Sequence, residues 1–147
     1  MADSFAADLR KFMEKTKISM DKVVRKVTFD LFGEVVMRTP VDTGMARSNW
    51  QLGINERPTG IVDDAKRRIN KQRNDKWGSY KTAKTVISAP MMANLSNVKA
   101  GGVNYIANNL PYIKQLEYGS SKQAPQGMAW ITVQNFQRIV DEALRSL

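Results

Sequence analysis

The stretch YIKQLEYGSSKQAPQGMAW, residues 112–130, decides how the C-terminal part of the chain folds. Apolar residues at helical spacing follow Pro111, and proline suits the first position of a helix. Gly119 is expected to end this short helix, because glycine takes the left-handed conformation at low cost. A polar loop with a second proline follows, and Gly127 leads the chain into its last helix. The stretch therefore predicts a helix, a loop and a second helix.

Glu117 is the unusual residue of this stretch. It is the only acid between Asp75 and Asp141, in a segment that is otherwise basic. A single carboxylate there is a natural partner for a fixed cation or for backbone amides. We expect it to bind Arg47 or the backbone amides of the Gly-Ser-Ser turn that follows, within one subunit or between two. We interpret Glu117 as a structural group in preference to a catalytic acid.

Towards the N-terminus, residues 4–38 have the pattern of one amphipathic helix. Asp3 or Ser4 is expected to cap its start. The helix should stop at Thr39, because Pro40 disfavours helical geometry in the residue before it. A helix of that length is a rod of roughly 50 Å. Such a rod can pack along its own sheet or against another subunit, and the sequence leaves both open.

A second conspicuous stretch, RTPVDTGMARSNWQ, occupies residues 38–51. Its Asp42 can accept hydrogen bonds from turn amides, and Gly44 can take a positive φ. Alternating apolar residues then predict a half-buried strand with one face formed by Trp50, Leu52 and Ile54.

Further strands are expected at residues 84–89 and 102–109, the second with Val103, Tyr105 and Ala107 alternating. The final helix should span residues 127–147. Its expected apolar side consists of Trp130, Val133, Phe136 or Gln137, Val140, Leu144 and Leu147. The whole chain, residues 1–147, is thus expected to form a single α+β domain. In it, a long N-terminal helix and a C-terminal helix pack on a small, mainly antiparallel β-sheet.

Residues 57–84 differ in character and look like an inserted basic arm. Nine basic residues face three acids there, a net charge of +6 out of +9 for the whole chain. Such a segment is either a solvated excursion or a surface that meets phosphate or acidic protein. The residues expected to face a partner or DNA are Lys66, Arg67, Arg68, Lys71, Arg73 and Lys76.

The composition argues against an enzyme. The chain has no histidine and no cysteine, so serine–histidine, cysteine–histidine and histidine- or thiolate-ligated zinc chemistry are excluded. The acids are scattered, and neither adjacent pair resembles a catalytic dyad. We expect no cofactor and no metal site. No apolar run reaches the roughly 20 residues of a membrane span, and the N-terminus lacks the pattern of a signal peptide, which indicates synthesis in the cytoplasm.

The two motifs together resemble the tail-completion, or head-to-tail joining, proteins in the neck of long-tailed double-stranded DNA bacteriophages. The matching positions of the first motif are Thr39, Pro40, Val41, Asp42, Thr43, Gly44, Arg47, Ser48 and Trp50. Those of the second are Tyr112, Glu117, Tyr118, Gly119, Pro125, Gly127 and Met128. The motifs and both terminal helices cover about three quarters of the chain. The basic arm departs from the family pattern, so its role is not implied by the resemblance.

This resemblance implies a non-enzymatic virion protein that forms a closed ring at the neck, a hexamer in preference to a dodecamer. Its partners would be other copies of itself, the tail tube protein, the head–tail connector protein and the passing genomic DNA, without sequence specificity. It would be made in the host cytoplasm and would reside in the virion.

Two other classes remain open at this point. The chain could be a stand-alone nucleic-acid-binding protein, in which the basic arm contacts phosphate while Trp77 and Tyr80 stack on bases. A magnesium-dependent hydrolase or nuclease would need a cluster of acids, and the sequence shows none. Whether the arm faces DNA or an acidic protein also stays open.

Overall fold

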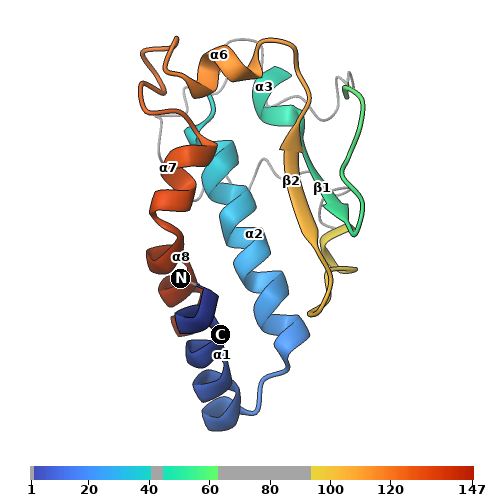
Figure 1. Ribbon diagram of the computed structural model, residues 1–147, viewed down its shortest axis with the longest axis vertical. Helices are drawn as coiled ribbons and strands as arrows, with labels where there is room; N and C mark the ends of the chain where they lie inside the picture. The colour runs from blue at the N-terminus through green and yellow to red at the C-terminus, as the bar shows by residue number, and fades with distance from the viewer. Residues whose placement is uncertain (1, 41–44, 63–93) are drawn as a thin grey trace.

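The computed structural model describes residues 2–40, 45–62 and 94–147 (Figure 1). Helices from both ends of the chain pack with a two-stranded antiparallel sheet, which confirms the expected α+β class. The described elements are α1 (Ala2–Thr16), α2 (Met20–Arg38), α3 (Met45–Ser48), β1 (Trp50–Ile54), β2 (Asn104–Asn108), α6 (Ile113–Glu117), α7 (Ala129–Gln134) and α8 (Phe136–Arg145).

The N-terminal segment forms two helices, so the prediction of a single rod over residues 4–38 is wrong. The chain reverses direction between α1 and α2 (Figure 1), with Lys17 at a φ of 60°. Ser19 then caps α2, because its hydroxyl accepts a hydrogen bond from the amide of Lys22. The reversal lets α1 bury Leu9, which a straight rod would leave far from the rest of the chain.

The start of α1 differs from the prediction, whereas the end of α2 agrees with it. The helix α1 begins at Ala2, so neither Asp3 nor Ser4 is the residue before it. The expected end of α2 is confirmed, since the helix stops at Arg38 and Thr39 is its extended C-cap. Pro40 follows directly and is buried.

The C-terminal helix is present but is divided at Asn135 into α7 and α8. The longer part, α8, packs along α2 (Figure 1). Between α1, α2 and α8 lies a small core made of Leu9, Val23, Val27, Val140 and Ala143. Phe5 of α1 meets Phe136 of α8 edge to face, with ring centroids 5.4 Å apart.

An ion-pair network on the surface joins α2 to α8. The guanidinium of Arg138 lies 3.2 Å from Glu34 of α2 and 3.1 Å from Glu142 of its own helix. Burial works to lower the pKa of Arg138, but the hydrogen bonds and charges of the two carboxylates outweigh it and raise that pKa. The charges of Glu34, Arg138 and Glu142 are therefore paired within the chain.

The sheet confirms the two strands expected around residues 50–54 and 102–109. In the antiparallel register Leu52 lies opposite Ile106. Trp50 and Leu52 are buried, and Ile106 packs against the same core. Tyr105 lies on the other face of β2 and is 37% exposed, and Val103, directly before the strand, is 56% exposed. The expected alternation of Val103 and Tyr105 therefore faces outward. The strand expected at residues 84–89 lies outside the described residues.

The loop before β2 fixes the sheet to α2. Arg25 of α2 donates a hydrogen bond from Nε to the carbonyl of Val98, at 2.8 Å. The carboxylate of Asp21 accepts one from the amide of Ala100, also at 2.8 Å. Val98 is itself fully buried. Hydrogen bonds to α2 therefore hold this loop at Val98 and at Ala100, before the chain enters β2.

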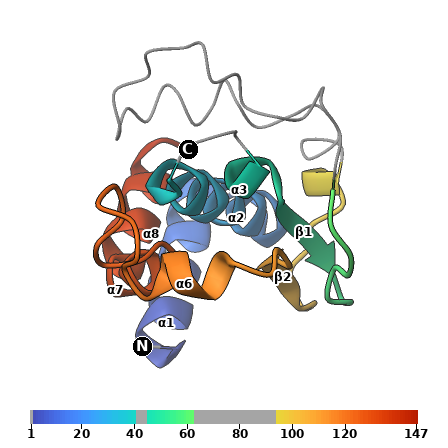
Figure 2. The ribbon, with the colours of Figure 1, turned by 90° about the horizontal axis from the view of Figure 1, so that it is seen from above.

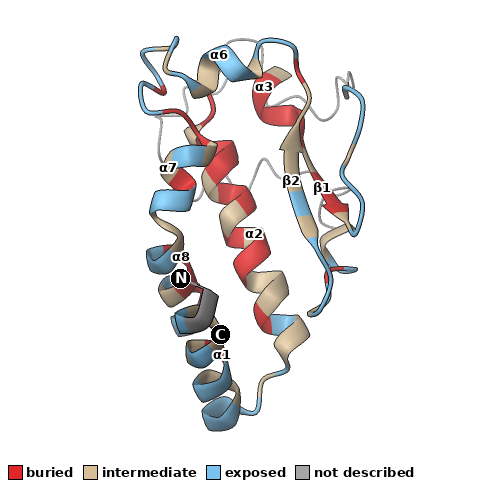
Figure 3. Cartoon of the chain, in the orientation of Figure 1, coloured by how far each residue is buried: buried red, intermediate tan, exposed pale blue. Residues whose placement is uncertain are grey.

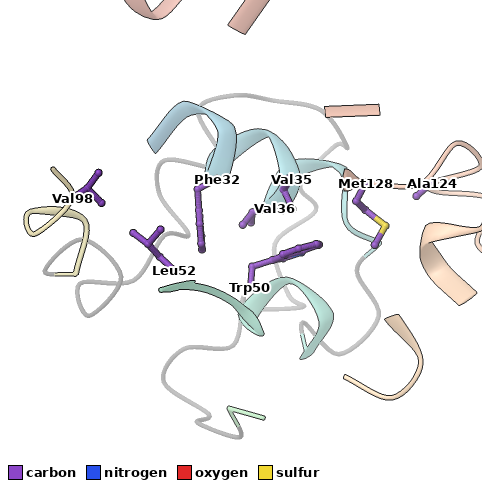
Figure 4. Packing of buried hydrophobic residues seen from close by; sticks show 8 residues of the cluster. All are labelled: Phe32, Val35, Val36, Trp50, Leu52, Val98, Ala124 and Met128. Atoms are coloured by element: carbon purple, nitrogen blue, oxygen red, sulfur yellow. The ribbon is translucent and has the colours of Figure 1, made fainter. Parts of the chain in front are cut away.

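The main core lies between α2 and the sheet, where burial is concentrated along the inner side of α2 (Figure 3). It consists of Phe32, Val35, Val36, Trp50, Leu52, Val98, Ala124 and Met128 (Figure 4). Trp50 comes from the first sequence motif and Met128 from the second, so one core joins the two motifs. Within the described ranges, no helix is long and apolar enough to cross a membrane.

Candidate functional site

The first motif, residues 38–51, closes the C-terminal end of α2. Thr39 is fully buried, and its amide donates to the carbonyl of Val36. Its hydroxyl donates to the carbonyl of Val35 at 2.6 Å and accepts from the indole Nε1 of Trp50 at 2.7 Å. Because the last carbonyls of a helix have no partner within the helix, this hydroxyl links the helix end to β1.

Arg47 provides the second contact at the same helix end. It is only 2% exposed, and its Nε donates to the carbonyl of Thr39 at 2.9 Å. Its Nη2 donates to the carbonyl of Met37 at 3.3 Å. A cation is favourable there because the helix dipole places partial negative charge on these carbonyls. Arg47 thus holds α3 against α2, so the expected pair of Arg47 with Glu117 does not form within the chain.

Of the remaining residues of the first motif, Val41, Asp42, Thr43 and Gly44 lie outside the described residues. The expected roles of Asp42 as an acceptor and Gly44 at a positive φ therefore stay predictions.

The second motif, residues 112–130, begins with the short helix that the sequence predicts. Tyr112 precedes α6 and is 43% exposed. Gly119 has a φ of 91°, and its amide donates to the carbonyl of Leu116. The amide of Ser120 donates to the carbonyl of Gln115, which completes the hydrogen-bond pattern of a left-handed helix end. The expected role of Gly119 is confirmed.

Glu117 connects the two helices of the second motif. Its Oε2 accepts hydrogen bonds from the amides of Met128 and Ala129 at 2.8 and 3.1 Å. Its Oε1 accepts one from the amide of Trp130 at 2.8 Å. These amides form the start of α7, where partial positive charge favours a carboxylate. The partners of Glu117 are therefore backbone amides, as one of the two expectations had it. These amides belong to the start of α7 and not to the Gly-Ser-Ser turn.

Both glycines of the second motif are sterically required. A Cβ on Gly119 would lie against the carbonyl of Pro125, and one on Gly127 would collide with the backbone and carboxylate of Glu117. Gly127 also has a φ of 81°. It is followed by Met128, which is fully buried in the main core. The two glycines therefore let the loop between α6 and α7 close on itself.

No pattern in the sequence predicts the contacts that hold the first residues of the basic arm. The side chain of Asn49, which is fully buried, donates to the carbonyl of Val62 and accepts from its amide, at 2.9 and 2.8 Å. Gln51 donates to the carbonyl of Gly60. Asn109 donates to Pro58 and Gly60. Asn49 falls on the polar side of the alternating pattern around Trp50, so that pattern does not predict its burial.

The basic residues of the arm, Lys66, Arg67, Arg68, Lys71, Arg73 and Lys76, lie outside the described residues. Trp77 and Tyr80, which the nucleic-acid reading assigns to stacking, lie outside them too. The arm is thus described only as far as Val62.

Several large apolar side chains near the second motif face solvent. Tyr118 is 85% exposed, Trp130 64% and Val133 52%. The expectation that Trp130 and Val133 share the buried side of the last helix is therefore wrong. The rest of the expected side is confirmed, since Val140 is buried and Phe136, Leu144 and Leu147 pack against the small core. The other buried residues of this region are Met128, Thr132, Ile139 and Ala143. Thr132 can be buried because its hydroxyl donates to the carbonyl of Met128.

The motif residues that the structure describes thus form two helix-end assemblies that share one core. No group of three or more His, Cys, Asp or Glu side chains in residues 2–40, 45–62 and 94–147 could hold a metal ion. Comparisons with protein families, with curated proteins and with solved structures give no match to this chain.

Proposed function

We propose that the chain is a structural virion protein of a tailed bacteriophage, which forms a closed ring at the neck. There it would complete the tail and join it to the head connector around the DNA channel. The proposal rests on the resemblance of the two sequence motifs to the tail-completion family, and on what those motifs do in the fold.

The observation that carries the proposal is the engagement of Glu117. Its carboxylate is the only acid of the second motif, and three backbone amides occupy it. Arg47, the cation of the first motif, is buried against the end of α2. A pair of motifs that served catalysis would present such groups to a substrate. Here Glu117 and Arg47 bind helix ends instead, which supports a structural protein whose motifs stabilise the fold.

The charge of the chain is compatible with a place beside DNA. Six copies at +9 each would put about +54 of formal charge around one channel. A conduit must still let DNA pass, and phosphate contacts are strong and salt-dependent. The proposal therefore includes weak DNA binding, with part of the basic charge facing acidic protein neighbours.

Titration of the purified chain with double-stranded DNA at two salt concentrations, combined with electron microscopy, tests this proposal. We expect ring-shaped particles and weak binding. The alternative is a stand-alone nucleic-acid-binding protein. Such a protein would bind DNA tightly, and its affinity for DNA would fall steeply as salt rises, with a slope set by the number of phosphate contacts. Particles without ring shape that bind DNA in that way would overturn the structural proposal. A variant with Lys66, Arg67 and Arg68 changed to Gln reports whether the arm supplies the DNA contacts.

A further inference from the structure

Among the described elements, one helix and both strands carry no charge, and of the two strands β1 is the more buried. The helix α7 has the sequence AWITVQ and the strand β2 has the sequence NYIAN. Every other described helix contains at least one charged residue. Two copies of a chain with a net charge of +9 repel each other. They can approach most easily through surfaces that lack charge.

The uncharged helix carries an exposed apolar surface, which we call the α7 patch and which consists of Tyr118, Trp130 and Val133. Trp130 and Val133 are three residues apart and so lie on one face of the helix. Tyr118 directly follows Glu117, whose carboxylate is bound to the amide of Trp130. All three side chains are more than half exposed. The nearby Arg138 is paired with Glu34 and Glu142, which limits its repulsion of a second copy.

The second surface, the β2 patch, consists of Tyr105 on the uncharged strand and Val103 just before that strand. These residues are two apart and share the face of the strand that is opposite to Ile106. Within the described residues, β2 pairs only with β1. A strand at the edge of a sheet has unpaired backbone groups, and natural proteins commonly protect it with lysine or other charged residues. The strand β2 has no charged residue. It is therefore suited to contact with another chain.

The elements that carry the two patches lie on different sides of α2. The helix α7 is at one side of α2 and β2 is at the other, both in the view of Figure 1 and from above in Figure 2. A contact between two unlike patches of identical chains is heterologous, and it closes into a ring when the rotation between neighbours allows it.

The exposed area also favours such a contact over a two-fold dimer. The exposed parts of two aromatic rings and one valine amount to roughly 300–400 Å². A stable interface buries about 800 Å² on each partner. A dimer through the α7 patch alone would use one patch per copy. A ring uses both patches of every copy, and so removes more apolar surface from water per chain.

We propose that neighbouring copies meet through the α7 patch of one chain and the β2 patch of the next. This inference rests on the proposed ring, since it assigns the surfaces through which that ring would close.

Cysteine cross-linking tests the contact directly, because the chain has no cysteine of its own. Full-length chains carry Trp130→Cys, Tyr105→Cys, or both, and are treated with a short bismaleimide. The doubly substituted chain should give a ladder of cross-linked multimers. Each singly substituted chain should remain monomeric on a denaturing gel, while an equal mixture of the two should give dimers only. Lys11→Cys combined with Tyr105→Cys is the matched control and should give no ladder.

The other outcomes separate this inference from the proposed function. Self-cross-linking of the Trp130→Cys chain would show a two-fold contact and overturn the inference. If light scattering finds that the doubly substituted chain is itself an oligomer and it still does not cross-link, the contact is wrong while the ring proposal survives. If the chain is monomeric and no variant cross-links, both are contradicted.

A second set of variants tests the same contact without cross-linking. Trp130→Asp and Tyr105→Asp each place a charge on one patch, and both positions are exposed, so the fold should be retained. Each variant alone should be monomeric, whereas an equal mixture should contain heterodimers through the remaining intact patches. Oligomers unchanged in both single variants would overturn the inference.

Discussion

Oε1 of Glu117 lies 2.8 Å from the amide nitrogen of Trp130, so the last residue of α6 caps the start of α7. The same carboxylate also accepts from the amides of Met128 and Ala129. An acid that stands alone in a basic half of the chain is thereby explained as a fold element. Its position also fixes Trp130, the central residue of the α7 patch.

Replacing Glu117 by Gln should destabilise the chain. The glutamine side chain has the same shape, but its NH₂ group cannot accept a hydrogen bond from the backbone amides. The substitution also removes the negative charge at the start of α7. We expect the free energy of unfolding to fall by about 2 kcal/mol, measured by urea denaturation. Glu142→Gln is the matched control, since it removes only an exposed ion pair and should cost less than about 0.5 kcal/mol. Equal stability of the two variants would contradict the assigned role.

Gly127 and Gly101 both have a positive φ but should respond differently to alanine. Gly101 has a φ of 86° with open space around a Cβ, so Gly101→Ala should cost about 1 kcal/mol of conformational strain. At Gly127 the added Cβ would also collide with Glu117. We therefore expect Gly127→Ala to cost about 3 kcal/mol. Thermal unfolding of the two variants measures the difference, and similar melting temperatures would argue against the close contact of Gly127 with Glu117.

The linkage of Thr39 to Trp50 can be measured with a double-mutant cycle. Thr39→Val leaves the buried indole N–H of Trp50 without its acceptor, which should cost about 2 kcal/mol. Trp50→Phe removes the donor, so the double variant should be less destabilised than the sum, by about 1 kcal/mol. Thr39→Ser keeps the hydroxyl and should cost less than Thr39→Val. Strict additivity in urea denaturation would indicate that the hydrogen bond contributes nothing.

The reversal between α1 and α2 predicts a large effect at Leu9. This side chain is 5% exposed in the small core with Val23 and Val140, so Leu9→Ala should cost about 2–4 kcal/mol. Lys11→Ala, on an exposed position of the same helix, should have almost no effect. In a straight N-terminal rod Leu9 would lack these partners. Nearly unchanged stability of the Leu9→Ala chain would therefore contradict the helical hairpin.

Local features of the sequence were enough to predict much of this fold. Pro40 marked the end of α2, Gly119 marked the end of α6, and alternation marked both strands. These signals act within a few residues and so can be read without knowledge of the tertiary structure. The same holds for the structural role of Glu117, because its isolation in a basic segment is visible in the sequence.

The remaining features depend on contacts between distant segments. Apolar residues repeat on both sides of Lys17, so periodicity alone cannot tell a rod from a hairpin. The positive φ of Lys17 and the cap by Ser19 decide it. Trp130 and Val133 fit an apolar stripe as well as Met128 and Thr132 do. In the structure the side with Met128 and Thr132 is buried, while the carboxylate of Glu117 binds the first amides of α7.

The solution mass of the purified chain, measured by light scattering at low and high salt, tests the central claim of a self-assembling ring most directly. We predict one discrete species at six times the 16.6 kDa chain mass. It should persist at high salt, because apolar patches are not weakened by screening of charge. A monomer at every salt concentration would contradict a ring that forms by itself through these patches.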